Sequence, residues 1–417
     1  MAGETLPGTD DGDPERIVCH VDMDCFYASC ERLREPALEG EPVVVGMGYE
    51  EGESHGAVAT ASYEAREYGV ESAQPISQAL DALTPVERAD GDGPAGHYRP
   101  VDMEYYRGVA AEIKEILRDC ADVVREVSVD EAYLDVTDRT AWTDVGDGRT
   151  LAEGYARYVK DRIRREVGVP ASVGVAPNMS TAKVASDYDK PNGLVVVRPG
   201  EVREFLAPLP VEEVHGVGPV TARELGDLGI ETAGDLADAD PAALEDRFGS
   251  RGRELHDRAR GRDEREVTPT GRPKSLSRES AFPEATTDHG AVRETAAALA
   301  ADVAERARSR GAMYRTIGVK VVTPPYDVNT RARSLPGPVD EPELVSEVAL
   351  ELLAEFRESP VRKVGVRVSK LSFADEDQAS LDGWAGREAD AGGRPDPNEP
   401  GRQRRRGGQA SLTDFDG

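Results

Sequence analysis

The sequence predicts an α+β protein of several domains, the first of which contains a ferredoxin-like β-α-β-β-α-β core. Three observations support this fold class. The length of 417 residues exceeds what one hydrophobic core usually serves. Strand and helix patterns alternate along the first half of the chain, and polar segments at 263–271 and 374–417 interrupt the second half. These features indicate folded parts joined by polar segments.

The first half supplies the elements of the core. An apolar strand at 17–23 leads into a helix that ends before Pro36, because proline cannot continue a helix. A strand at 42–45, a helical stretch at 62–68 and a loop at 91–96 follow. The remaining elements are, in order, a helix at 103–119, strands at 123–128 and 132–136, a helix at 150–167 and a strand at 171–175. With 26–97 set aside as an insertion, this order places the end of the first strand beside the turn between the two middle strands.

The second half divides into three parts. A small helical unit covers 200–262 and begins near HGVGPVTARELGDLGI. A polar linker follows at 263–271, within the stretch RDEREVTPTGRP, which contains two prolines. A further α+β domain is expected at 272–373, with strand candidates at 316–322 and 363–371. Composition predicts disorder in the leader, 1–15, and in the tail, 374–417.

The net charge of −29 is unusual for a protein that binds DNA, because phosphate contacts require basic side chains. Adaptation of the whole proteome to high salt explains the excess carboxylate instead. At molar salt the Debye length is about 3 Å, so a distant acidic surface repels DNA little. The charge therefore concerns habitat, and DNA binding stays open.

Composition also bears on the location of the protein. No apolar run reaches about 18 residues, so no membrane span is expected. The acidic N-terminus lacks the apolar region of a signal peptide. The four cysteines show no CxxC spacing, which disfavours zinc and fits a reducing compartment. We expect a cytoplasmic protein.

Carboxylates follow two of the predicted strands. Asp22 and Asp24 flank Met23 at the end of the first strand, and Asp130 and Glu131 follow another strand in VSVDEAYLDV. Carboxylate oxygens are the ligands that Mg²⁺ prefers. Two such ions about 3.5–4 Å apart can activate a hydroxyl and stabilise a leaving pyrophosphate. A solvated turn residue is an equally good interpretation of Asp24 alone.

VDMDCFYASCE and SVDEAYLDVT resemble the two catalytic motifs of Y-family DNA polymerases, in particular those of the DNA polymerase IV (DinB-type) branch, and the resemblance extends over roughly 16–373. It implies a right-hand polymerase that adds deoxynucleotides to a primer 3′-end, with low-fidelity translesion synthesis and no proofreading exonuclease. The domains that it implies are a palm at 16–25 and 98–199, fingers at 26–97, a thumb at 200–262 and a little finger at 272–373. It also implies that Asp22, the Met23 carbonyl and Asp130 hold two Mg²⁺, with Glu131 as the metal-bound catalytic residue.

Aromatic and basic residues beside these motifs predict nucleotide contacts. A bulky ring beneath the incoming sugar would clash with a 2′-hydroxyl, and the resemblance assigns this steric gate to Tyr27. Phe26 is a second nucleotide contact or a core residue. Tyr63 and Arg66 share a helix face, and by resemblance they bind the triphosphate together with Lys190 of the KPNG turn. Cys25 departs from the family, which often has an aromatic residue there.

Two segments carry features of DNA binding. GVGPVTARELGDLGI resembles a helix-hairpin-helix element, in which Gly216 and Gly218 let backbone N–H groups approach a phosphate. In 272–373 basic residues slightly outnumber acidic ones, against the trend of the whole chain. We expect one sheet face there to grip the DNA backbone. Its expected cations are Lys274, Arg278, Arg331 and Arg333.

The tail repeats a short motif, QASLDGW at 378–384 and QASLTDF at 409–415. The second copy resembles the peptide that docks on a sliding clamp, with Gln409, Leu412 and Phe415 as its contacts. The expected partners are thus primer-template DNA, deoxynucleoside triphosphates and a sliding clamp, bound by a monomer.

Two other functions stay open. Nucleotidyl cyclases also place carboxylates on a ferredoxin-like domain, although they have no use for a hairpin element and a basic domain. A catalytically idle, clamp-tethered scaffold is the second alternative, but every expected metal carboxylate is present in the sequence.

Overall fold

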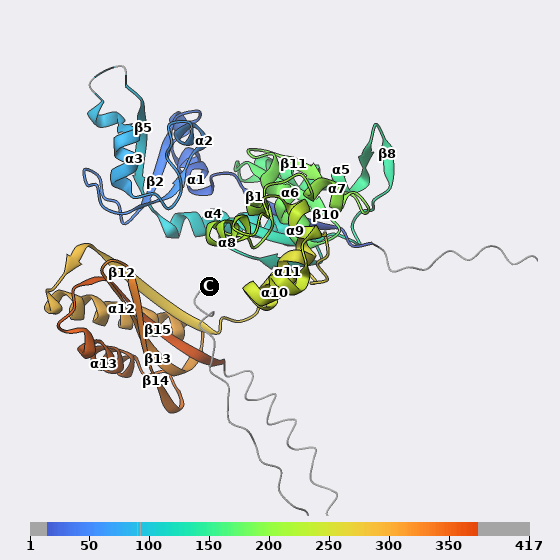
Figure 1. Ribbon diagram of the computed structural model, residues 1–417. Coiled ribbons are helices and arrows are strands. Elements are labelled where there is room, and N and C mark those ends of the chain that lie inside the picture. The colour runs from blue at the N-terminus through green and yellow to red at the C-terminus, as the bar shows by residue number, and fades with distance from the viewer. Residues whose placement is uncertain (1–14, 90, 92, 374–417) are drawn as a thin grey trace, which may run out of the picture. The chain divides into compact units, whose positions relative to one another are not determined.

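The structure is a computed structural model that describes residues 15–89, 91 and 93–373 (Figure 1). Contacts divide the chain into two compact units, Met1–Arg272 and Pro273–Gly417. The tail with both copies of the QASL motif, and all of the expected leader except Glu15, lie outside the described residues. Within the described part of the chain, no helix has the length and apolarity needed to cross a membrane.

The first unit contains a five-stranded sheet in the order β11-β10-β1-β7-β6. Its strands are β1 (Val18–Met23), β6 (Val123–Glu126), β7 (Glu131–Asp135), β10 (Ala171–Ala176) and β11 (Leu194–Val196). Strand β1 pairs antiparallel with both β7 and β10. Without β11, which the sequence interpretation missed, this is the ferredoxin-like order that was predicted.

Helices cover both faces of this sheet. Helices α4 (Met103–Cys120) and α5 (Leu151–Glu166) share one core cluster with Cys19, Val21 and Met23. Helix α6 (Met179–Tyr188) packs on β1 and β10, in a second cluster with Val18 and Tyr133. Alternate residues of β1 therefore face different layers. A short hairpin, β8 (Asp144–Gly146) and β9 (Arg149–Thr150), precedes α5.

The inserted segment, 26–97, forms a sheet of its own in the order β3-β2-β5-β4. Its strands are β2 (Val43–Met47), β3 (Ala57–Ala61), β4 (Thr84–Pro85) and β5 (Ala95–Pro100). Its helices are α1 (Phe26–Arg34), α2 (Tyr63–Arg66) and α3 (Ile76–Ala82), with 3₁₀ turns at Pro36–Leu38 and Val86–Arg88. The loop expected at 91–96 was wrong at its end, because Gly96 belongs to β5. A Cβ at Gly96 would lie 2.4 Å from Leu83 Cδ2, so close packing explains this glycine.

The helical unit begins with α7 (Val202–Leu206), which a 3₁₀ turn at Val211–Glu213 follows. The other helices are α8 (Pro219–Gly226), α9 (Ala233–Asp238), α10 (Pro241–Phe248) and α11 (Ser250–Ala259).

The segment 263–271, expected as a polar linker, is anchored to the first unit. Asp263 Oδ2 accepts a hydrogen bond of 3.0 Å from Ser180 N at the start of α6, and Arg16 Nη1 donates one of 2.9 Å to Arg265 O. Val267 is 5% exposed within the core of the helical unit. Polar composition concealed these contacts, because only Val267 is apolar and the others use the Asp263 carboxylate and the backbone carbonyl of Arg265.

The second unit has a four-stranded sheet in the order β12-β15-β13-β14. Its elements are β12 (Ser275–Thr286), α12 (His289–Ser309), β13 (Ala312–Thr323), β14 (Asp327–Val339), α13 (Pro342–Leu353), a 3₁₀ turn at Ala354–Phe356 and β15 (Val361–Phe373). Both helices share a core with Ile317, Val319, Val366 and Val368 of the central strands. The edge strands β12 and β14 were not predicted, because few of their side chains are buried and their apolar pattern is weak.

Candidate active site

The carboxylates meet at the end of β1 because of the strand register. His20 and Asp22 lie opposite Tyr133 and Glu131 of β7, and directly opposed residues of an antiparallel pair point to the same face. Met23 N donates a hydrogen bond of 3.0 Å to Asp130 O, which holds the turn before β7 against the end of β1. The structure therefore brings together the two segments that the sequence interpretation paired.

Helix α6 adds a cation that the sequence interpretation left unassigned. Lys183 Nζ lies 2.9 Å from Asp22 Oδ2 and 3.1 Å from Glu131 Oε2. Its neighbours in α6 are nearly all buried small or apolar residues. A single lysine within such a helix was the signal that could have identified it, because a lysine on a buried face needs a carboxylate partner.

Proton affinities in this cluster follow from the charges around each group. The pKa of Glu131 falls from 4.5 to about 2, because His20 and Lys183 face its carboxylate and outweigh the effect of burial. His20 Nε2 is the more distant of the two at 3.4 Å, and no hydrogen bond satisfies it among the described residues. Lys183 is thus the closer and stronger partner of the Glu131 carboxylate. Burial would lower the pKa of Lys183, but Asp22 and Asp187 raise it above its ordinary value.

The cluster fits a divalent cation. Ligand atoms of His20, Asp22 and Glu131 all lie within 4.8 Å of one another. Asp130, next to Glu131, is not part of this group of three, and its carboxylate accepts a hydrogen bond from Ser128 Oγ. Burial raises the pKa of Asp130, and the charges of Asp22 and Glu131 raise it further. Several carboxylates this close repel one another, and a hard cation relieves that repulsion.

The predicted triphosphate contacts lie beside this cluster. Lys190 Nζ is 2.8 Å from Asp22 Oδ1 and also 2.8 Å from Asp187 Oδ1. Tyr63 OH donates a hydrogen bond of 3.3 Å to Asp24 Oδ1, and the Arg66 guanidinium stacks on the Tyr63 ring at 4.6 Å. Tyr63 and Arg66 thus share one face of α2, as their spacing predicted, while Lys190 reaches the cluster from the end of α6.

The two aromatic residues after the first motif have different surroundings. Cys25 has a φ of 38°, and this left-handed residue turns the chain from β1 into α1. Tyr27 is partly exposed and stacks on Tyr106, with ring centroids 4.6 Å apart. Phe26 is only 1% exposed and lies in the core. Core residues therefore surround the Phe26 ring, and a nucleotide contact of Phe26 stays a prediction.

The helix-hairpin-helix glycines lie before α8. Gly216 has a φ of 97°, and a Cβ there would lie 2.5 Å from Arg258 Nη1. Gly218 is the N-cap of α8 and makes no side-chain cap. The left-handed backbone favours glycine at Gly216, whereas the extended backbone at Gly218 would accept other residues.

Three of the expected cations in the second unit, Arg278, Arg331 and Arg333, share one sheet face, but it is the face that the two helices cover. Their contact with DNA stays a prediction. Arg278, Arg331 and Arg333 are ion-paired with Asp302, Glu355 and Glu351, which belong to α12, to the 3₁₀ turn after α13 and to α13. Alternation decides this, because Arg331 pairs in register with buried Val319 and so points to the helix side. Lys274 precedes β12 and is exposed.

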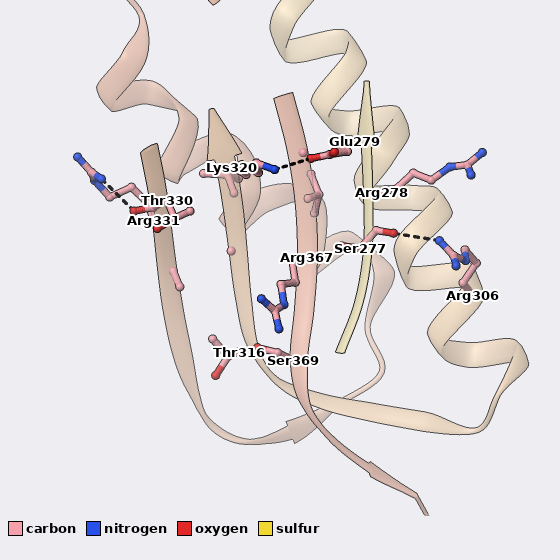
Figure 2. A pocket seen from close by; sticks show the side chains of 15 residues that line it. Ser277, Arg278, Glu279, Arg306, Thr316, Lys320, Thr330, Arg331, Arg367 and Ser369 are labelled. Atoms are coloured by element: carbon pink, nitrogen blue, oxygen red, sulfur yellow. Dashed lines mark hydrogen bonds and ion pairs between the residues drawn. The ribbon is translucent and has the colours of Figure 1, made fainter. Parts of the chain in front are cut away.

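Polar residues, Arg278 and Arg331 among them, line a hollow of about 760 Å³ in the second unit. Figure 2 shows Arg367 and Lys320 projecting from β15 and β13 among small polar residues. Lys320 pairs with Glu279 Oε2 at 3.1 Å. Gly318 and Gly365 leave room in this surface because they have no side chain.

Comparisons with known proteins agree with this architecture. The chain matches the impB/mucB/samB family over residues 21–187, the C-terminal domain of that family over 273–382 and the HHH motif of the IMS family over 199–230. A protein of Halobacterium salinarum named DNA polymerase IV is 63% identical over 94% of this chain and 93% of its own length. One of Methanoculleus marisnigri with the same name is 43% identical over 88% of this chain and 98% of its own length.

Solved structures give the same result. A Y-family DNA polymerase chimera of Dbh and Dpo4 is 30% identical with a TM-score of 0.73, covering 86% of this chain and 99% of that one. DinB from Sulfolobus solfataricus is 29% identical with a TM-score of 0.56 at the same coverage. The chain therefore belongs to the impB/mucB/samB family and is a Y-family DNA polymerase of the DinB type.

Proposed function

We propose that this enzyme adds deoxynucleotides to a primer 3′-end at the cluster of Asp22, Asp130 and Glu131, as a translesion polymerase without proofreading. The observation that carries the proposal is the register of β1 with β7, which sets Asp22 opposite Glu131 beside Asp130. Two Mg²⁺ ions bound there would promote attack by the 3′-hydroxyl and neutralise the leaving pyrophosphate.

The protein residues have separate tasks in this proposal. Asp22, Asp130 and the Met23 carbonyl hold the metal ions. Glu131, whose pKa is about 2, stays ionised at neutral pH. A carboxylate with so low a pKa is a weak base and a good ligand, so Glu131 serves as a metal-bound catalytic residue rather than a proton acceptor.

The incoming nucleotide is held by residues around the cluster. Lys190, Arg66 and Tyr63 present cationic and hydroxyl donors to the triphosphate. The Tyr27 ring, supported by Tyr106, excludes a 2′-hydroxyl by close packing. A bound triphosphate would offer its oxygens to Lys190 in place of Asp22, and Asp22 would then be available to hold a metal ion.

DNA contacts are proposed on both units. Gly216 and Gly218 let backbone N–H groups approach a phosphate at the start of α8. In the second unit, Arg367 and Lys320 are the better candidates because they project from β15 and β13 into the polar hollow, on the sheet face opposite the helices, although Lys320 is itself paired with Glu279. Of the four cations expected from sequence, exposed Lys274 remains a DNA-contact candidate. Arg278, Arg331 and Arg333 can contribute only by leaving their ion pairs.

The other expected partners and properties remain proposals from the sequence. These are a sliding clamp bound by Gln409, Leu412 and Phe415, a monomeric state and a cytoplasmic location. Deleting 409–417 tests the clamp contact. We expect it to abolish stimulation by a clamp and to leave extension of a short primer without a clamp unchanged.

Primer extension in molar KCl with Mg²⁺ tests the central proposal. Wild type should extend a primer only when template DNA is present, which separates it from a cyclase. Asp22→Ala and Asp130→Ala should lose nearly all activity, whereas Asp138→Ala, an exposed carboxylate beyond β7, should retain it. Full activity of Asp130→Ala would support an idle scaffold and overturn the proposal.

A further inference from the structure

Asp24 is a buried carboxylate that the proposed chemistry does not use. It is 1% exposed, directly after β1, and two residues beyond Asp22. A carboxylate removed from water needs several donors to offset the loss of hydration. The identity of those donors therefore indicates the purpose of Asp24.

Three donors from separate parts of the first unit converge on Asp24. Oδ1 accepts hydrogen bonds from Ser172 Oγ of β10 at 2.8 Å and from Tyr63 OH of α2 at 3.3 Å. Oδ2 accepts one from Asn192 N at 2.7 Å. Both carboxylate oxygens of Asp24 are thus engaged by hydroxyl and backbone N–H donors, whereas those of Asp22 are held by the ammonium groups of Lys183 and Lys190.

The contact with Asn192 fixes the turn that carries Lys190. Gly193 N donates a hydrogen bond of 3.1 Å to Ser172 Oγ, and Lys160 Nζ donates one of 3.1 Å to Gly193 O. Ser172 therefore bonds to the turn as well as to Asp24. Since Lys190 lies two residues before Asn192, the direction of its side chain depends on this anchored turn.

The contact with Tyr63 holds α2 against the palm sheet. Burial raises the pKa of the Tyr63 hydroxyl above its ordinary value, and the negative charge of Asp24 raises it further. The hydroxyl is therefore neutral and able to donate a proton. Arg66 stacks on the same ring, so fixing Tyr63 also limits where Arg66 can lie.

We propose that Asp24 is a positioning residue that aligns Tyr63, through its hydroxyl, and Lys190, through the turn at Asn192, for an incoming triphosphate. Asp24 is not a metal ligand in this proposal. It joins the fingers segment to the palm at the point where the two share the nucleotide. The proposal rests on the function proposed above, because it requires Tyr63 and Lys190 to contact the triphosphate.

Asp24→Asn is the decisive variant. It preserves shape, but an amide replaces one acceptor oxygen by a donor and so cannot accept all three hydrogen bonds. We expect the KM for a deoxynucleotide to rise about tenfold, as for the loss of one good hydrogen bond. We expect kcat and the Mg²⁺ concentration for half-maximal activity to stay within about twofold.

Tyr63→Phe and the double variant test whether Asp24 acts through Tyr63. The effects of two residues that act through one contact do not add in free energy. The KM of the double variant should therefore be at most about twice the higher of the two single-variant KM values. Fully multiplicative effects on KM would overturn the link to Tyr63. A wild-type KM for Tyr63→Phe would instead count against the proposed nucleotide contact itself, so the two failures are distinguishable.

Controls separate positioning from loss of stability. Thr232→Ala removes the N-cap of α9 far along the chain and should lower Tm without changing KM. If Asp24→Asn does not fold, Ser172→Ala weakens the same turn and should raise KM to a smaller degree. A KM unchanged in both Asp24→Asn and Ser172→Ala would overturn the proposal, and so would a large shift in the Mg²⁺ requirement, which would make Asp24 a metal ligand.

Discussion

Lys183→Met tests the charge balance of the active site. The ammonium lies 2.9 Å from Asp22, 3.1 Å from Glu131 and 3.3 Å from Asp187, and its side chain is 24% exposed. Methionine keeps most of the length and removes the charge. The carboxylates of Asp22 and Glu131 would then repel each other with less positive charge nearby. This repulsion destabilises the folded state in the absence of a metal.

The size of the effect follows from competing terms. At an effective dielectric constant of about 20, one contact at 2.9 Å attracts by about 6 kcal/mol. Desolvation of a mostly buried ammonium cancels much of this, and removing one partner of a buried ion pair typically costs about 3 kcal/mol. A bound divalent cation supplies the missing charge, so the loss should fall below about 1 kcal/mol with saturating Mg²⁺.

Urea unfolding in molar KCl, with EDTA or with Mg²⁺, measures both values. Lys320→Met is the matched control, because Lys320 pairs with Glu279 at 3.1 Å and is 30% exposed, in the second unit. Its smaller loss should be the same with and without Mg²⁺. A loss in Lys183→Met that does not depend on Mg²⁺ would refute the idea that lysine and metal compensate the same carboxylates.

Three further predictions follow from the site and the second unit. Because the pKa of Glu131 is depressed from 4.5 to about 2, its contribution to stability is complete above pH 4.5 and is lost as the pH falls toward 2. In EDTA, Glu131→Gln should therefore remove up to about 3 kcal/mol of acid-sensitive stability, and parallel curves of unfolding free energy against pH would contradict this. Tyr27→Ala should increase ribonucleotide insertion roughly 10- to 100-fold relative to deoxynucleotide insertion, as measured by single-nucleotide extension; an unchanged ratio would place the gate elsewhere. Arg367→Ala should weaken DNA binding and reduce the salt slope by about 1, whereas Arg333→Ala, whose arginine pairs with Glu351, should change binding little; the opposite order in a fluorescence titration would favour the cations expected from sequence.

The comparisons help to explain the net charge of −29. A relative at 63% identity comes from Halobacterium salinarum, which fits a salt-adapted enzyme. Most of the basic side chains described above are already paired with carboxylates, as Arg331 is with Glu355. At molar salt such exposed pairs are strongly screened, so each contributes little to stability.

The local pattern of apolar and polar residues was enough to predict the central elements of the palm. Apolar runs with turn residues between them predicted β1, β7 and β10, and the 3.6-residue period predicted α4 and α5. The edge strands β12 and β14 escaped prediction because strands with one neighbour and few buried side chains have a weak apolar pattern. The loop expected at Gly96 failed for a related reason, since a glycine needed for close packing reads like a turn.

The sequence by itself determined the family, the ferredoxin-like order and the meeting of Asp22 with the Asp130-Glu131 turn. The succession of strands and helices along the chain and the spacing of the motifs can both be read from short segments. Tertiary structure alone decided that Lys183 compensates two of these carboxylates and that Asp24 joins Tyr63 to the turn at Asn192. It also decided that Arg331 faces a helix. Each of these depends on which face of a strand or helix meets another element, and that choice depends on packing between residues far apart in the chain.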